Sequence, residues 1–288
     1  MTDPRVESAA PLRILPSGSG AILVELPDLA DTMALLADLQ AEPLHGVLEM
    51  VAGARTLSLR FDPQVTSATD LTSALALRRL HPPRPESQRT VEIPVRYDGE
   101  DLAEVARLTG LSETEVIRRH TQSPWTVAFG GFAPGFAYLS GGDPALDVPR
   151  RKAPRTRIPA GAVALAGCFS GVYPTASPGG WQIIGTTPVQ MWDLTRQPPA
   201  LLSAGDRVRF VAISDTKYAE IAAQTQAAPL SADAAHMVGA QGRLTVTKSP
   251  FPILLQDAGR SGQTAQGVSA SGVMDLGALR SLNRMLGN

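Results

Sequence analysis

Residues 125–212 consist of short β-like runs separated by glycine- and proline-rich turns, and this pattern constrains the fold more than any other feature of the chain. Glycine adopts turn conformations that other residues avoid, and proline stiffens loops and interrupts regular structure. Closely spaced strands with such turns are typical of an all-β barrel or sandwich. The sequence therefore predicts a mainly-β domain in this part of the chain.

The residues near the start of the chain show strands and helices in the order ββαββα. Alternating apolar and polar residues predict the strands, and apolar residues at helical spacing predict the helices. Asp28, and either Thr66 or Ser67, stand where helix caps are expected. We expect strands at 12–16, 21–26, 46–51 and 56–61, and helices at 28–40 and 67–80. This order predicts a compact α+β domain over residues 1–80.

A polar, proline-rich stretch at 81–88 is typical of a linker, and we expect a second domain over residues 90–226. Its first part reads as a strand followed by two short helices, with Ser112 at the cap of the second helix. A closing helix follows the β-rich region. We expect the strand at 90–97 and the helices at 102–109, 112–121 and 215–225.

Residues 242–288 begin a new pattern, with a strand at 243–247, a glycine-rich loop at 256–262 and a helix at 274–286. So few large apolar groups cannot form an independent core. We therefore interpret this tail as the start of a further β-rich module. The expected fold class is an α+β domain, then a mainly-β barrel, then a fragment of that second module.

The chain has 288 residues, 43% of them apolar, and a formal net charge of −1. This balance gives no field that attracts nucleic acid or an anionic membrane surface. The single cysteine, Cys168, excludes an intramolecular disulfide and a cysteine-built metal site, and no other metal-ligand spacing is present. No segment resembles a signal peptide or approaches the roughly 20 apolar residues of a membrane span. We therefore expect a cytoplasmic protein without a metal site.

A cluster of cations within residues 149–161 is the first candidate for a binding site. Such a run is often a solvated face, but prolines at 149, 154 and 159 bracket this one and restrict its side-chain directions. Arg155 and Arg157 would share one side of an extended segment and together hold a carboxylate or phosphate. Lys152 suits a phosphate as a point charge, and we assign it a candidate catalytic role. The five cations are Arg150, Arg151, Lys152, Arg155 and Arg157.

Two glycine pairs and one histidine complete the candidate site. Gly130–Gly131 and Gly179–Gly180 either present backbone amides to an anion or serve as ordinary turns, and neither pair matches a P-loop. Trp181 follows the second pair, and we expect it at the rim of the pocket. His120, near the end of a predicted helix, is either a packing residue or a general base, and we include it as a second catalytic candidate.

Four segments of the β-rich region have distinctive sequences: FAPGFAYL at 132–139, PRTRIPAG at 154–161, GVYP at 171–174 and SPGGW at 177–181. Together they resemble the Kip-type family, which includes the B subunit of 5-oxoprolinase, allophanate hydrolase subunit 1-like proteins and the C–D part of the urea carboxylase carboxyltransferase domain. The resemblance covers roughly residues 12–225. In the tail, TKSPFPILLQDAGR at 247–260 and GVSASGVMD at 267–275 resemble the start of the C subunit of 5-oxoprolinase.

The resemblance implies a cyclophilin-like β-barrel that acts with two partners, which resemble the C and A subunits of 5-oxoprolinase. It implies the ATP-dependent opening of 5-oxoproline, a small cyclic amide, to glutamate, with Mg²⁺ accompanying the ATP. In this reaction the chain and its C-like partner would activate the lactam by phosphorylation. Two alternatives stay open at this point. One is an allophanate or urea-amide hydrolase or a biotin-dependent carboxyltransferase, with biotin as cofactor in the latter case. The other is an inhibitor of a sensor histidine kinase.

Overall fold

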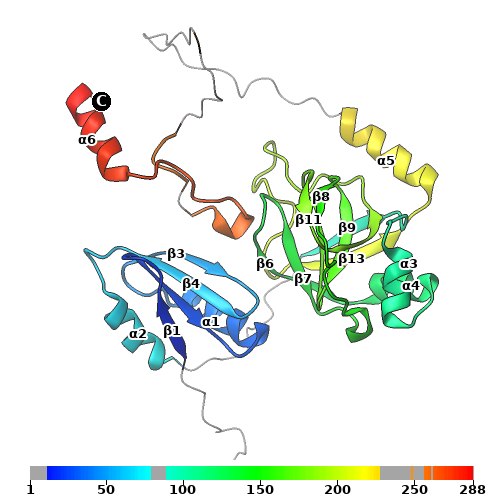
Figure 1. Cartoon of the computed structure of the whole chain (residues 1–288), viewed down its shortest axis with the longest axis horizontal. Coiled ribbons are helices and arrows are strands. Elements are labelled where there is room, and N and C mark those ends of the chain that lie inside the picture. Colours follow the sequence, from blue (N-terminus) through cyan, green and yellow to red (C-terminus); the bar gives the residue numbers. More distant parts are fainter. Residues whose placement is uncertain (1–11, 79–88, 228–247, 249–255, 261, 288) are drawn as a thin grey trace, which may run out of the picture.

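The computed structural model describes residues 12–78, 89–227, 248, 256–260 and 262–287 (Figure 1). Its N-terminal part follows the predicted ββαββα order. An antiparallel sheet with strand order β1-β2-β4-β3 packs against helices α1 and α2, and Leu35, Leu39, Leu71 and Leu75 of the helices are buried against it. The elements are β1 (Arg13–Pro16), β2 (Ala21–Glu25), α1 (Leu29–Ala41), β3 (Val47–Ala52), β4 (Thr56–Phe61) and α2 (Ala68–Ala76).

The predicted caps begin these helices. The Asp28 carboxylate accepts a hydrogen bond from the Asp31 amide at 2.9 Å, and the Ser67 hydroxyl accepts one from the Asp70 amide at 3.2 Å. Each cap satisfies a backbone donor that the first turn leaves without a helical partner. The polar residue before each apolar repeat therefore determines where the helix begins.

The β-rich region forms one mixed sheet with strand order β12-β9-β10-β7-β6-β13-β5. The two edges approach each other, because the Arg96 and Thr186 backbones exchange hydrogen bonds of 2.8 Å. The result is a nearly closed, barrel-like sheet. Its strands are β5 (Thr90–Val95), β6 (Trp125–Gly130), β7 (Ala137–Ser140), β9 (Ala162–Ala166), β10 (Phe169–Val172), β12 (Gln182–Thr186) and β13 (Arg207–Ala212).

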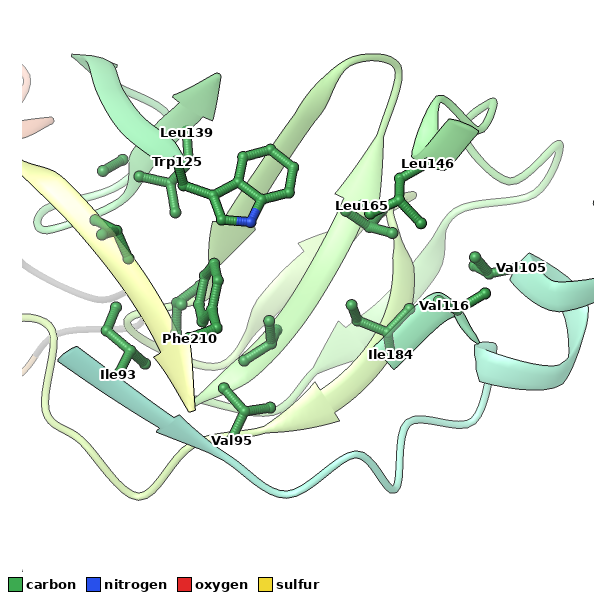
Figure 2. Close-up of a cluster of buried hydrophobic side chains, with 14 of the residues drawn as sticks. Ile93, Val95, Val105, Val116, Trp125, Leu139, Leu146, Leu165, Ile184 and Phe210 are labelled. Carbon is green, nitrogen blue, oxygen red and sulfur yellow. The ribbon is translucent and has the colours of Figure 1, made fainter. Parts of the chain in front are cut away.

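The inner face of this sheet is apolar. Figure 2 shows side chains from several strands pointing together, with Trp125 and Phe210 as the largest rings. Helices α3 (Leu102–Thr109) and α4 (Glu113–Gln122) add Val105 and Val116 to the same core. The apolar face of each helix thus covers the sheet, as its helical spacing predicts.

The outer face of the same sheet carries a second apolar layer. In β9, Val163 and Leu165 belong to the inner core, whereas Ala162, Ala164 and Ala166 belong to the outer cluster. Their side chains alternate because successive residues of a strand point to opposite faces. The short pair β8 (Arg155–Ile158) and β11 (Ser177–Gly179) lies beside this cluster and contributes Ile158 to it.

The tail, residues 242–288, is described only in part. Helix α5 (Asp215–Ala227) ends the second region, and the predicted strand at 243–247 lies outside the described residues. The 3-10 turn η3 (Thr264–Gln266) lies between the N-terminal sheet and the barrel, and α6 (Leu276–Leu286) extends away from both (Figure 1). Among the described residues, no helix combines the length and apolar character that crossing a membrane requires.

Candidate functional site

Asp101 organises the cation cluster from inside the molecule. Its carboxylate, 3% exposed, accepts two hydrogen bonds from the Arg155 guanidinium, at 2.9 and 2.8 Å. It also accepts one from Arg151 at 2.5 Å and one from the Ile183 amide at 2.7 Å. Arg155 pairs in addition with Glu100 at 2.8 Å. This network joins the start of α3 to β8 and β12.

The ionised form of Asp101 is favoured. Burial acts to raise the pKa of its carboxyl group, but the hydrogen bonds from Arg155 and Ile183 and the charges of Arg155 and Arg151 outweigh it. The pKa therefore lies below its usual range. Arg155 thus binds a carboxylate, as the sequence suggested, but that carboxylate belongs to the chain itself. We correct the prediction that Arg155 is available to a ligand.

The other cations of the cluster face outward. Arg150, Lys152 and Arg157 are exposed, and none has a hydrogen-bond or ion-pair partner within the part of the chain that the structure describes. Of the two arginines of β8, Arg155 binds Asp101 and Arg157 does not. For Lys152 and Arg157, binding of an external anion stays a prediction.

The positive charge of Arg150 acts on two phenol groups. Burial raises the pKa of the Tyr138 hydroxyl, and the positive charge of Arg150 acts in the opposite direction. The same holds for Tyr173, where a hydrogen bond with the Trp181 backbone also opposes the effect of burial. Both pKa values stay above the ordinary value, so both hydroxyls are protonated donors at neutral pH.

These phenols belong to a cluster of rings on the outer face of the sheet, which we call the aromatic face. Its rings lie 4.6 to 6.1 Å apart between centroids, mostly edge to face, the arrangement that aromatic quadrupoles favour. The small residues of β9 and Gly171 leave room for them, since a Cβ on Gly171 would lie 3.0 Å from Phe136. The aromatic face consists of Phe129, Phe132, Phe136, Tyr138, Phe169, Tyr173 and Trp181.

Phe132 is the exposed member of this face. It is 57% exposed, and its φ of 68° lies in the left-handed region that side chains rarely adopt. Its ring lies 5.2 Å from Phe136 and 5.9 Å from Tyr173 between centroids. A bulky residue held in a strained conformation at a surface points to a binding role. By contrast, Trp181 is 5% exposed and packs under the face, so its predicted position at the rim is wrong.

The glycine pairs contribute close packing. A Cβ on Gly179 would lie 2.4 Å from the Tyr173 hydroxyl, and one on Gly130 would lie 2.3 Å from the Ala265 carbonyl oxygen. The Gly180 carbonyl accepts a hydrogen bond from the Arg151 amide at 2.7 Å, and the Gly131 amide donates to Phe136 at 3.2 Å. Packing alone explains why Gly130 and Gly179 lack side chains. Anion binding by these four residues stays a prediction.

His120 lies in the inner core. Its side chain has no exposed surface, its Nδ1 lies 2.7 Å from the Tyr97 hydroxyl and its Nε2 lies 2.9 Å from the Ser170 hydroxyl. It stacks on Phe210 with 4.3 Å between centroids. Burial lowers the pKa of His120 to about 3. A ring so enclosed touches no ligand, so we correct the catalytic assignment of His120 to a structural one.

The residues that sequence reasoning missed are Asp101, Tyr138 and Tyr173. Asp101 precedes a helix, where an acidic residue is ordinary, and 54 positions separate it from Arg155. Nothing local marks the pair. The two tyrosines stand within the segments that carry the family resemblance, and that position was the available signal. Cys168 is exposed in the turn between β9 and β10.

Comparison with known proteins identifies the family of this chain. Residues 12–202 match the family model described as carboxyltransferase domain, subdomain C and D. The chain is 40% identical over 202 residues to the B subunit of 5-oxoprolinase from Bacillus subtilis (strain 168), covering 64% of this chain and 83% of that protein. It is 35% identical over 215 residues to the B subunit of 5-oxoprolinase from Haemophilus influenzae (strain ATCC 51907 / DSM 11121 / KW20 / Rd), covering 69% of this chain and 97% of that protein.

Among solved structures, the crystal structure of TTHA0988 aligns with a TM-score of 0.67 at 33% identity. The alignment covers 93% of this chain but 53% of TTHA0988, so this chain spans about half the length of that protein. Kluyveromyces lactis urea carboxylase aligns with a TM-score of 0.58 at 17% identity, covering 75% of this chain and 24% of that protein. That second likeness is one of fold alone.

Proposed function

Because this chain belongs to the family of carboxyltransferase domains, subdomain C and D, we propose that it is a component of an ATP-dependent 5-oxoprolinase. In the proposed reaction, phosphorylation by ATP activates the lactam, and 5-oxoproline, ATP and two water molecules give glutamate, ADP and phosphate. Two observations support this proposal. The relatives that align over most of their own length are 5-oxoprolinase B subunits, and this chain carries a surface suited to a small cyclic acid.

The aromatic face is the surface that we assign to the substrate. 5-Oxoproline has a carboxylate and a five-membered lactam ring with one N–H and one carbonyl. A guanidinium binds a carboxylate with charge-assisted hydrogen bonds. The protonated phenol of Tyr138, which is partly exposed, is a suitable donor to a carbonyl, and Phe132 supplies an apolar wall for the ring. The observation that carries the assignment is the exposed Arg150, whose positive charge acts on the Tyr138 phenol.

Lys152 and Arg157 are the residues of this chain whose charge suits the phosphates of ATP. Both are exposed and lie in the same segment as Arg150. Positioning and electrostatic stabilisation supply most of the catalysis in phosphoryl transfer, so unpaired cations near the substrate are an appropriate contribution. Mg²⁺ commonly binds through substrate phosphates and one or two carboxylates. In this proposal it arrives with ATP. The cytoplasm, where ATP is available, stays the expected location.

The proposed partners are a module like the C subunit of 5-oxoprolinase and a separate protein like its A subunit. The alignment with TTHA0988 covers more of this chain than residues 1–227 contain, so it includes part of the tail. TTHA0988 thus holds counterparts of the barrel and of the tail in one chain. This supports a fusion of B-type and C-type parts. The likeness to urea carboxylase concerns the fold, so it does not favour biotin chemistry.

The test is turnover by the full-length protein combined with its A-type partner. We expect consumption of 5-oxoproline coupled to ADP formation. We expect Arg150→Ala to weaken 5-oxoproline binding about tenfold, as the loss of a charge-assisted bond implies. Arg107→Ala is the matched control, because Arg107 is an exposed arginine whose one ion pair among the described residues is with Glu104 in its own helix. A folded, assembled complex that leaves 5-oxoproline unchanged would contradict the proposal.

A further inference from the structure

Residues 262–267 of the tail bind to the N-terminal domain through one side chain, Glu49 of β3. Its carboxylate accepts a hydrogen bond from the Gly262 amide at 3.1 Å and one from the Thr264 hydroxyl at 2.8 Å. The Glu49 side chain is 6% exposed, and Arg60 pairs with it at 3.3 Å. Two of the three donors to this carboxylate come from the tail. A buried carboxylate without such donors would destabilise the folded protein, so Glu49 binds the tail specifically.

The same tail segment also contacts the barrel, and there the contact is backbone on backbone. The Gly135 amide donates a hydrogen bond to the Gln266 carbonyl at 2.9 Å. A Cβ on Gly130 would lie 2.3 Å from the Ala265 carbonyl oxygen, and one on Gly267 would lie 2.2 Å from the Ala133 carbonyl oxygen. Approach this close requires glycine on both sides. Figure 1 shows this segment between the two domains.

The barrel loop that receives the tail, residues 130–135, is the loop that carries Phe132. Within it, the Ala133 amide donates to Gly131 at 2.7 Å and the Phe136 amide donates to Ala133 at 2.9 Å. These bonds hold the loop in a tight turn, with Phe132 at a φ of 68°. A strained conformation persists only where surrounding contacts enforce it. The tail supplies contacts at both ends of this turn, at Gly130 and at Gly135.

We propose that Glu49 is a positioning residue, which anchors residues 262–267 between the two domains and thereby holds the 130–135 loop and Phe132 over the aromatic face. The tail is then part of the site, although it supplies no side chain to the aromatic face among the described residues. That this loop borders the substrate rests on the proposed function. The anchoring itself rests on the contacts above and stands without it.

Amide hydrogen exchange on the full chain tests the anchoring directly. We expect Glu49→Ala to speed exchange of the Gly135 amide about tenfold or more, because a bond to a charged group is lost and local opening becomes easier. Residues 262–267 should exchange faster as well. Glu49→Gln, which keeps the acceptor oxygen, should restore much of the protection. The inference is overturned if the Gly135 amide exchanges in Glu49→Ala as slowly as in the wild type.

A matched glycine pair tests the same point from the barrel side. Gly130→Ala places a methyl group against Ala265 and should release both the tail and the Gly135 amide. Gly131→Ala has its nearest contact at 3.6 Å, from Tyr138, and should leave both protected. Equal protection in the two variants would overturn the proposed docking. If Gly130→Ala does not fold, Thr264→Val can replace it. This variant removes one hydrogen bond to Glu49 and should also speed exchange of the tail and of the Gly135 amide.

Binding of 5-oxoproline then separates this inference from the proposed function. If the wild type binds 5-oxoproline, Glu49→Ala should weaken that binding several-fold without contact between Glu49 and the ligand. If binding stays at the wild-type level while the loop exchanges faster, the link between Phe132 and the ligand is overturned. If the wild type does not bind 5-oxoproline, the substrate assignment fails and the exchange experiments alone decide the anchoring.

Discussion

Two sets of cations from one short segment have opposite surroundings. Arg151 and Arg155 turn inward to the Asp101 carboxylate, whereas Arg150, Lys152 and Arg157 stay exposed, with no ionic partner in the described ranges. A cation removed from water requires a partner of opposite charge, and an exposed one does not. The buried Asp101 carboxylate therefore gives Arg151 and Arg155 a structural role, and the three exposed cations stay available for binding.

Substitution of Asp101 should cause the largest loss of unfolding free energy. Asp101→Ala leaves the Arg155 guanidinium and the Ile183 amide without their acceptor, and removal of one partner of a buried pair costs about 3–5 kcal/mol of unfolding free energy. Urea denaturation measures the loss. Glu100→Ala is the control, because that side chain is 62% exposed and its pair with Arg155 is worth less than about 1 kcal/mol. Equal losses in the two variants would refute the inward role.

The unfolding free energy should depend on pH through His120, which lies in the inner core. The folded-state pKa of His120 is about 3, below its ordinary value of 6.5, so between these values the unfolded chain binds one more proton than the folded chain. The stability contributed by neutral His120 is therefore lost as pH falls through this window. From pH 7 to pH 5 the wild type should lose about 2 kcal/mol from this group.

His120→Gln removes this titration, so its unfolding free energy should depend less on pH between 7 and 5 by that amount. Denaturation curves of both proteins at each pH provide the measurement. The ordinary carboxylates titrate mainly below this range and leave the comparison clear. Parallel pH profiles for the two proteins would show that the ring reaches water and would reopen a catalytic role.

Arg150→Ala and Arg155→Ala should separate binding from folding. We expect Arg150→Ala to lose about 1.4 kcal/mol of binding free energy for 5-oxoproline, the equivalent of tenfold, with little change in stability. Arg155→Ala should instead lose unfolding free energy, because Asp101 stays buried. Calorimetric titration and denaturation of both variants make the test. A stability loss shared by both would erase the distinction between inward and outward cations.

Lys152→Ala and Arg157→Ala should have the smallest effect on stability. Both side chains are exposed and have no ion pair among the described residues, so each change should alter the unfolding free energy by less than about 0.5 kcal/mol. Thermal or urea unfolding checks this. A larger loss in either variant would reveal a structural contact and move that residue to the inward set. Reduced turnover in an equally stable variant would support a role in handling ATP.

The local structure of this chain was largely predictable, and the arrangement of its site was not. Alternation and helical spacing anticipated the ββαββα order and helices α3, α4 and α6 to within a few residues. Asp28, Ser67 and Ser112 cap helices as expected. These features depend on neighbours in sequence, because a cap bonds to an amide three residues later and a strand alternates every second residue.

The candidate site depends on contacts between distant residues. The sequence marked the cations and glycines but treated Arg155 and Arg157 alike, since position along a strand says nothing about a carboxylate 54 residues away. It also placed Trp181 at a rim and gave His120 a catalytic candidacy, because exposure is a property of the packed sheet. The barrel strands were anticipated as a group, but not the two faces that separate the His120 core from the aromatic face.

The sequence by itself determined the family, the capped helices, the strands and the chemical character of the segment from Arg150 to Arg157. The tertiary structure alone decided which of those cations is neutralised, which rings reach the surface and where the tail docks. The physical reason is desolvation. A side chain's role is set by the partners that replace its water, and for Asp101, His120 and Glu49 those partners come from distant parts of the chain.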